Sequence, residues 1–206
     1  MKSRRFKATR FKKERSMALW GNDIKPKNLT DAEKKEVYAS PSGWVREAGS
    51  ILSGNGNTSA TPEVLVAIGG LNVNMGTANI TELEFVNTTY DKSAGFTMSV
   101  LARFNEAVTV TGTPQLAVTN GNQGSGTGRG PHTLSYASGS GTNELLFTLV
   151  IPAANAATNE DDVMVIGTNA MSLNSGTIKD LGTTTVSTIT NSSAIGTAAG
   201  SVTVVA

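Results

Sequence analysis

The residues FTMSVLARF at positions 96–104 decide the fold of this chain. Their apolar side chains fall on every second position, at Phe96, Met98, Val100, Ala102 and Phe104. Successive side chains of a strand point to opposite faces of a sheet, so this period of two puts one set in a core and the other in water. The stretch therefore predicts a half-buried β-strand.

The same alternation recurs further along the chain. It is seen in Val108 and Val110, in Leu116 and Val118, in Leu134 and Tyr136, and in Leu145, Phe147 and Leu149. Gly, Pro, Asn and Ser separate these runs and supply turn geometry. Short alternating strands bury their apolar faces by stacking two antiparallel sheets. We therefore predict a β-sandwich over residues 80–206.

Five further stretches are expected to add strands to this sandwich. They are residues 80–86, 163–166, 171–173, 184–189 and 201–205. For residues 80–86, a bridge between the N-terminal region and the sandwich is the alternative. The last of them is expected to close a sheet edge.

Three motifs in the sandwich carry a resemblance to a known family. They are FNEAVTVTGTPQL at 104–116, YASGSGTNELLF at 136–147 and LNSGTIKD at 173–180. In this order they resemble the bacterial immunoglobulin-like repeats of large surface and secreted proteins, over roughly residues 88–206. The resemblance implies a seven-stranded immunoglobulin-like sandwich that serves as a spacer or adhesive module, without catalytic residues. Residues 120–132 depart from the family because they are longer and richer in glycine than the usual hairpin.

The composition suits a turn-rich β protein. Aromatic residues are 5%, charged residues 16% and hydrophobic residues without glycine 38% of the chain, and the charged share lies below the ~25% of typical globular domains. We expect a thin core, to whose stability neighbouring chains contribute. The absence of cysteine excludes disulfides and thiolate metal sites. No apolar run approaches the ~18 residues of a membrane span, and no secretory signal follows the basic N-terminus.

The charge of the chain is segregated towards its N-terminus. Residues 1–15 hold eight Lys or Arg and one Glu, so they carry eight minus one, or +7; the whole chain carries +1, which leaves −6 for the remainder. Such segregation indicates a basic arm on a mildly acidic body. The arm, residues 1–16, has too few apolar groups to fold alone. We expect it to be extended and to bind a partner; a solvated tail is the alternative.

The predicted partner-binding residues are cations and aromatic side chains of the arm and of the region after it. They are Arg4, Arg5, Phe6, Lys7, Arg10, Phe11, Lys12, Lys13, Trp20, Trp44 and Arg46. The cations would pair with carboxylates or phosphates while the rings anchor the contact. For the two tryptophans, a place in a small core is the alternative role. A nucleic-acid partner is disfavoured because no recognition fold follows the arm. Met1 and Met17 both stay open as the natural start.

Residues 17–79 are predicted to form a small α+β anchoring region. Thr30 with Glu33 three residues later is a capping box, which predicts a helix of two to three turns. The helix would include Val37 and Tyr38 and end at Pro41. After it, residues 63–68 are expected to form a short buried strand and residues 72–78 a linker.

A second resemblance lies in this region. MALWG at 17–21, GWVR at 43–46 and EVLVAIG at 63–69 resemble the N-terminal part of virion structural proteins from T4-like marine cyanophages. Members of that family are head or other particle-surface components, and none of the three motifs is catalytic. The sixteen residues before Met17 depart from the family.

No stretch of the sequence points to catalysis. His132 is the only histidine, with no G-x-S-x-G elbow elsewhere, and it is expected to be a surface residue of a loop. Paired carboxylates for glycoside hydrolysis would have to come from Glu82, Glu84, Glu106 and Glu144, and no spacing singles out a pair. We therefore expect no catalytic residue and no cofactor.

Two loops are candidate ligand sites in the sequence. The acidic turn at 160–162 lacks the spacing of a calcium loop, so a solvated turn is expected, with bound calcium as the alternative. The glycine-rich loop that contains Arg129 is followed by a strand and not by the helix that a phosphate cradle needs. We expect the tip of a hairpin there, at which Arg129 contacts a neighbour. No metal site is expected.

These observations predict a virion structural protein without enzymatic activity. Its expected place is the capsid surface, where it would act as a decoration (cement) protein that binds the major capsid protein and neighbouring copies of itself and stabilises contacts between capsomers. The alternative is a host- or glycan-binding immunoglobulin-like display module on the virion, or a tail or neck component. No membrane contact is expected, and copy number and symmetry stay open.

Overall fold

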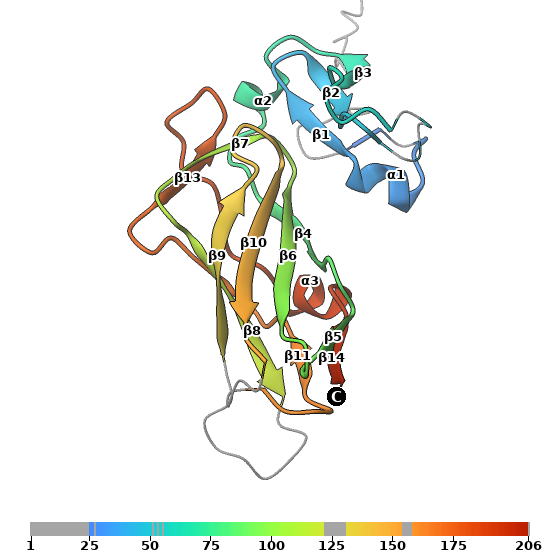
Figure 1. Ribbon diagram of the computed structural model, residues 1–206. Coiled ribbons are helices and arrows are strands. Elements are labelled where there is room, and N and C mark those ends of the chain that lie inside the picture. The colour runs from blue at the N-terminus through green and yellow to red at the C-terminus, as the bar shows by residue number, and fades with distance from the viewer. Residues whose placement is uncertain are drawn as a thin grey trace, which may run out of the picture.

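The computed structural model describes residues 25–205 apart from 27, 51, 53, 55, 122–130 and 154–157. Within these residues the protein is mainly β, as the alternating pattern predicts, and it has two parts (Figure 1). Residues 25–75 form a small N-terminal module. Residues 78–205 form a sandwich-like body, and the N-terminal module lies at one end of it.

The N-terminal module is built on a three-stranded antiparallel sheet in the order β1-β2-β3. Its elements are α1 (Asp31–Lys35), β1 (Val37–Ser40), β2 (Gly43–Arg46), β3 (Glu63–Ala67) and α2 (Leu71–Asn74). The buried apolar side chains Val37, Ala39, Trp44, Leu71 and Met75 form its core.

The capping box at the start of α1 is confirmed, but the predicted helix length is wrong. The Thr30 backbone N–H donates to Glu33 Oε2 at 2.8 Å, and the Glu33 N–H donates to Thr30 Oγ1 at 3.2 Å. The helix ends at Lys35, and Val37 and Tyr38 lie in β1. Helix propensity is a weak preference that tertiary burial overrides. In β1, Val37 is buried in the core of the N-terminal module and Tyr38 between the two parts of the protein.

Two other expectations in this module are corrected. The strand at residues 63–68 is an edge strand whose side chains are half-buried or exposed, with Val64 48% exposed. The predicted linker at residues 72–78 begins instead with the short helix α2. Its apolar residues Leu71 and Met75 are buried against the small sheet, which explains why the chain turns there.

The sandwich contains one long path of paired strands in the order β4-β6-β10-β9-β8-β11-β14-β5, with β12 also paired to β8. Their bounds are β4 (Ile80–Phe85), β5 (Thr89–Asp91), β6 (Phe96–Phe104), β8 (Gln115–Gly121), β9 (His132–Ser138), β10 (Glu144–Ile151), β11 (Val163–Val165), β12 (Met171–Ser172) and β14 (Ser201–Val205). A separate two-stranded sheet pairs β7 (Val108–Thr111) with β13 (Thr177–Asp180). The helix α3 (Ser193–Ala198) precedes β14.

The path is rolled into two layers because β8 serves both. Residues 115–118 of β8 pair with β9, and residues 119–121 pair with β11. At the far end of the path, β5 returns beside β6: the Ser99 N–H donates to the Tyr90 hydroxyl at 3.2 Å, and the Tyr90 and Phe96 rings stack 4.2 Å apart. One layer is thus β4, β6, β10 and β9, and the other is β8, β11, β14 and β5 (Figure 1).

The core between the layers comes from the alternating residues. Met98, Val100, Ala102 and Phe104 of β6 are fully buried, which confirms the period-two prediction. The same holds for the predicted positions in β8, β9 and β10: Leu116, Val118, Leu134, Leu145 and Phe147.

In the C-terminal half, the strand predicted at 184–189 is wrong, and the strand predicted at 201–205 is confirmed but not at the expected place in its sheet. Residues 184–189 make only isolated bridges, from Val186 to Lys179 and from Thr188 to Asn79. The strand at 201–205 does not close a sheet edge, because β14 lies between β11 and β5. The edge position is taken by β5, a three-residue strand whose alternation is too short to be seen in the sequence.

Candidate functional site

The two parts of the protein meet in a packed joint. Tyr38 and Val45 from the small sheet are buried with Ala107 of the sandwich, and Leu181 packs against them. Two hydrogen bonds cross the joint, from the Ala39 N–H to the Asn105 carbonyl at 3.1 Å and from Asn72 Nδ2 to the Leu181 carbonyl at 3.1 Å. The joint brings the end of α1 next to β4, since Lys35 of α1 pairs with Glu82 of β4.

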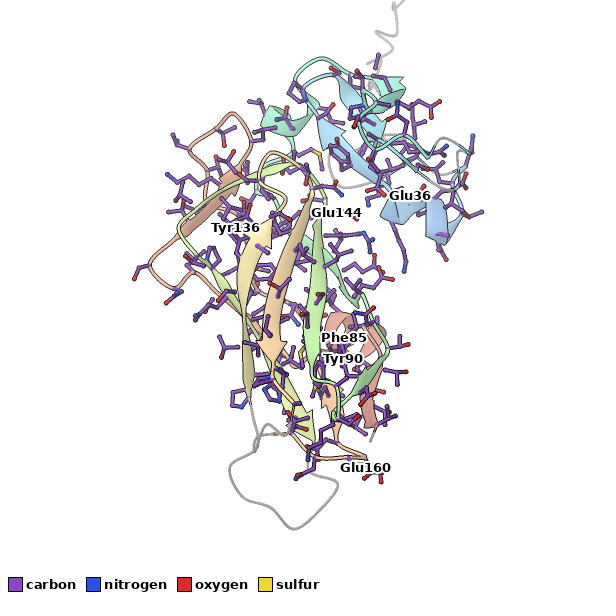
Figure 2. The ribbon with its side chains drawn as sticks, viewed as in Figure 1. Glu36, Phe85, Tyr90, Tyr136, Glu144 and Glu160 are labelled. Carbon is purple, nitrogen blue, oxygen red and sulfur yellow. The ribbon has the colours of Figure 1, made fainter. Side chains whose placement is uncertain are left out.

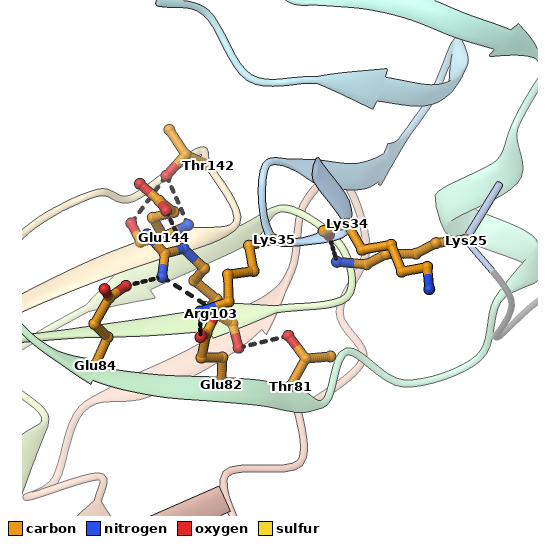
Figure 3. Close-up of polar contacts among 9 residues, drawn as sticks. All are labelled: Lys25, Lys34, Lys35, Thr81, Glu82, Glu84, Arg103, Thr142 and Glu144. Carbon is orange, nitrogen blue, oxygen red and sulfur yellow. Dashed lines mark hydrogen bonds and ion pairs between the residues drawn. The ribbon is translucent and has the colours of Figure 1, made fainter. Parts of the chain in front are cut away.

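Arg103 is the centre of the polar contacts beneath α1 (Figure 3). It lies on β6, directly opposite Glu82 of β4 and Glu144 of β10 in the strand register. Its Nε donates to Glu144, and its Nη1 donates to Glu84 and, at 3.2 Å, to Glu82. Burial lowers the pKa of Arg103, but the hydrogen bond to Glu84 and the charge of Glu144 more than reverse this and raise it. The guanidinium is therefore a fixed cation surrounded by carboxylates.

Lys35 extends this network to the N-terminal module, since its ammonium pairs with Glu82. Lys25 lies nearby and donates to the Lys34 carbonyl (Figure 3). Burial lowers the pKa of Lys25 to about 8, although Glu82 acts in the opposite direction. This corner of the molecule thus exposes little free positive charge.

A groove opens between the N-terminal module and the sandwich next to Arg103. It has a volume of about 730 Å³. Its charged lining consists of Lys35, Glu36, Glu47, Glu84, Arg103 and Glu144, and its other walls include Ala48, Leu52, Ala60, Pro62, Thr142 and Asn143. Figure 2 shows Glu36 and Glu144 on facing elements at this end, with Glu160 at the opposite end of the molecule. We call this feature the inter-module groove.

Glu47 carries the most perturbed carboxyl of the groove. Burial raises its pKa to about 7, and the charge of Glu144 adds to that effect. Glu47 makes no ion pair with any described residue. A cation that entered the groove would therefore find a carboxylate beside it.

Trp44 and Arg46 are the only predicted partner-binding residues within the described part of the chain. Trp44 is fully buried in the core of the small sheet, so its predicted contact with a partner is wrong and its alternative role as a core residue is confirmed. The Arg46 side chain is 12% exposed and pairs with Glu33 at 3.3 Å and Glu63 at 3.8 Å. It joins α1 to β3 and is not a free surface cation.

The other predicted contacts lie outside the described residues and stay predictions. They are Arg4, Arg5, Phe6, Lys7, Arg10, Phe11, Lys12, Lys13, Trp20 and Arg129.

His132 is not the surface residue that its loop position suggested. It is the first residue of β9, only 6% exposed, with Nε2 at 3.4 Å from the hydroxyl of the buried Thr158. Burial lowers the pKa of His132, and Asp162 opposes that shift. The alternation of β9 places His132 on the same face as the buried Leu134. This alternation is the feature of the sequence from which the burial of His132 could have been predicted.

In the acidic turn at residues 160–162, the carboxylate of Asp162 accepts hydrogen bonds from neighbouring protein groups. Asp162 is fully buried, and its Oδ2 accepts from Asn120 Nδ2 at 2.9 Å and from the Asn159 N–H at 2.8 Å. Within the described ranges, no group of three or more His, Cys, Asp or Glu side chains is arranged to hold a metal ion. Asp162 thus acts as the polar link between the turn and β8.

The carboxylates considered for glycoside hydrolysis also have structural partners. Glu82, Glu84 and Glu144 meet at Arg103, a grouping that the sequence did not reveal because it depends on which strands are neighbours. Glu106 lies away from them in a fully buried position next to Ala39. Retaining and inverting glycosidases need a facing pair in which one group is free to donate a proton. An arginine-bound cluster instead fixes the strands to each other.

Comparisons of the chain with protein-family models, with curated proteins and with solved structures find no match. The fold and the contacts therefore define the class of this protein by themselves: a mainly β, sandwich-like protein with a small module joined to one end. In the described part of the chain, no helix combines the length and apolar character that crossing a membrane requires.

Proposed function

We propose that this protein is a phage virion structural protein that decorates the capsid surface. It would bind the major capsid protein and neighbouring copies of itself and so stabilise the contacts between capsomers. The observation that carries the proposal is the division of charge and structure: a segment of +7 at residues 1–15 precedes a body of opposite net charge whose two parts are joined by a buried apolar cluster. We call residues 1–15 the strap and residues 25–205 the body.

The sandwich of the body is of the immunoglobulin-like type in this proposal, and its strand order supports that assignment. An immunoglobulin-like sandwich divides its strands into an ABED sheet and a second sheet that contains C, F and G. Here β4, β6, β10 and β9 would be A, B, E and D, while β8, β11 and β14 would be C, F and G. The strand β5 would be the second half of a divided A strand, since it follows β4 and pairs in parallel with β14.

The mechanism is additive binding. Each copy that binds the assembled shell and not the separated capsomers stabilises the shell by mass action. A binding segment attached to a folded body adds a second contact at high effective concentration, so the two contacts together hold more tightly than either alone. The cations of the strap would pair with acidic groups on the shell, and Phe6 and Phe11 would anchor it.

The test is removal of the strap from the full chain. Purified capsids without this protein are incubated with the full chain or with a form that lacks residues 1–16, and occupancy is measured after sedimentation. The truncated form should bind more weakly, and the difference should be largest at low ionic strength, where charge pairing is least screened.

A matched control separates charge from aromatic anchoring. The double substitution Phe6→Ala and Phe11→Ala keeps all eight cations of residues 1–15. It should lower occupancy without changing its dependence on salt. Equal occupancy of the full and truncated chains at every salt concentration would contradict the proposal.

A further inference from the structure

We propose that the inter-module groove binds the cation-rich segment at residues 2–15 of the same chain while the protein is free in solution. The proposed function concerns the bound state; this inference concerns the state before binding. In this state the groove would hold residues 2–15, and a partner would have to displace them from the groove before it could bind them.

The charge of the groove fits a cationic occupant. Its lining contains four carboxylates, Glu36, Glu47, Glu84 and Glu144, against the two cations Lys35 and Arg103, an excess of two negative charges. Both cations are already engaged, Lys35 by Glu82 and Arg103 by three carboxylates. Glu47 has no ion-pair partner among the described residues, so a lysine or arginine in the groove would supply the missing charge.

A second observation points to a peptide as the occupant. Asn143 lines the groove and is 1% exposed, and its Nδ2 has no hydrogen-bond acceptor among the described residues. A buried amide donor normally has an acceptor. The carbonyl groups of an extended segment are acceptors of the right kind. Beside it, Leu52 is 51% exposed and lines the groove with Ala48, Ala60 and Pro62, an apolar wall suited to the Phe6 and Phe11 rings.

The chain itself is the nearest source of such a segment. The described part begins at Lys25, whose charge acts on both Glu82 and Glu47. The nine residues 16–24 join Lys25 to the cation-rich segment and span at most about 30 Å when extended. A tether of this length holds its end at an effective concentration of the order of millimolar. A segment from a second copy would have to compete with it.

The experiment uses a nitroxide spin label on the full chain. The chain has no cysteine, so Ala8→Cys creates a single attachment site in the segment. We expect the label to broaden the backbone NMR signals of groove residues such as Glu47, Thr142 and Asn143 and to leave signals near Glu160 sharp. In about 1 M salt, where the Debye length is ~3 Å, the broadening should disappear.

Two variants test the role of the groove charges. The double substitution Glu36→Gln and Glu47→Gln in the labelled chain should reduce the broadening several-fold. The double substitution Glu160→Gln and Asp161→Asn removes the same two charges from the opposite end of the molecule and should leave the broadening unchanged. An equal loss in both variants would show general electrostatic attraction and overturn the assignment to the groove.

A mixing experiment decides between the same chain and a second copy. Isotope-labelled chains without a nitroxide are mixed with unlabelled chains that carry one. Sharp groove signals in the mixture, with broadened signals in the doubly labelled chain, support the proposal. Broadening of the groove in the mixture would assign the occupant to a second copy, and no broadening in either sample would leave the groove without this ligand; both results overturn it. None of these results depends on capsid occupancy, and the occupancy measurement tests the proposed function separately.

Discussion

Asp180 links three segments of the sandwich through one buried carboxylate. It is 1% exposed, and its Oδ1 accepts from the Ala78 N–H and from the Ser187 hydroxyl, both at 3.0 Å. Ala78 leads into β4, and Ser187 lies in the stretch that makes isolated bridges in place of a strand. The carboxylate thus adds to the backbone hydrogen bonds of this stretch, which run from the Ser187 N–H to the Ile178 carbonyl at 3.0 Å and from the Thr188 N–H to the Ala78 carbonyl at 2.7 Å.

We predict that Asp180→Ala lowers the free energy of unfolding by about 2–4 kcal/mol, because it leaves a buried backbone N–H without an acceptor. Asp180→Asn keeps the Oδ1 acceptor and should cost less. Urea denaturation of the full chain gives both values. The surface change Glu160→Ala is the control, and a loss no larger than that of the control would refute this role.

Glu47 should make the stability of the protein depend on pH. Its folded-state pKa is raised from 4.5 to about 7, first by burial and then by Glu144. The folded state therefore holds this proton more tightly than the unfolded state. The stabilising effect of the bound proton is lost as the pH rises from about 4.5 to about 7.

We predict that Glu47→Gln removes this loss. Relative to the original chain, the variant should gain about 1–2 kcal/mol of stability between pH 5 and pH 8, a value reduced for the partial exposure of the side chain. Denaturation curves at the two pH values measure the gain, and Glu160→Gln controls for the loss of one negative charge. A gain that is the same at both pH values would contradict the raised pKa.

At the scale of elements, the turn between β9 and β10 shows where backbone conformation is restrictive. Gly139 has φ of 110°, and a Cβ there would lie 1.9 Å from the Glu144 carbonyl oxygen. Gly182 also has a positive φ, 80°, but a Cβ there would meet nothing within 4 Å. A substitution at Gly182 therefore tests backbone strain alone, whereas a substitution at Gly139 tests backbone strain and steric overlap together.

We predict that Gly182→Ala destabilises the protein by about 1 kcal/mol through strain alone. Gly139→Ala should cost about 2 kcal/mol more, because the strands must also move apart. Since the turn carries Asn143 and Glu144, the substitution at Gly139 should also disturb the inter-module groove. Thermal or urea unfolding measures both losses of stability. Equal losses for Gly139→Ala and Gly182→Ala would contradict the prediction, because they would show that the overlap at Gly139 costs no free energy.

The strands with clear alternation could be predicted from the sequence, and the elements that depend on contacts between distant segments could not. The period of two located β6 exactly at its observed bounds, and the capping box located the start of α1. The helix prediction for Val37 and Tyr38 is wrong because tertiary packing selects the extended form: Val37 packs in the module core and Tyr38 packs in the joint. The three-residue strand β5 has too few positions to show a period.

The candidate site was less predictable than the fold. The sequence pointed to cations and tryptophans, but Trp44 forms core and Arg46 bridges two elements. The groove depends on the strand register around Arg103 and on the joint, and both are properties of tertiary structure. Local patterns alone do not contain that information.

At the scale of the whole molecule, the joint decides whether the two parts behave as one body. We predict that Tyr38→Ala, which removes a side chain only 8% exposed from the joint, loosens the N-terminal module. Hydrogen exchange should accelerate in β1, β2 and β3 and change little in β6 and β10. Tyr136→Ala is the matched control, because Tyr136 packs on Phe147 inside the sandwich, with ring centroids 6.1 Å apart.

The control should give the reverse pattern, with faster exchange in β9 and β10 and little change in the small sheet. Uniform acceleration through both parts in either variant would instead show a single cooperative unit.

The parallel pairing of β5 with β14 has a mechanical consequence. Thr203, Val204 and Val205 lie opposite Thr89, Tyr90 and Asp91, so the two strands run in the same direction. A pulling force applied between the N-terminal module and the end of β14 would slide one strand along the other and load the hydrogen bonds between them together. Peeling would break the same bonds one at a time and at lower force. In the capsid role that we propose, swelling of the particle would load these two strands in shear and not by peeling.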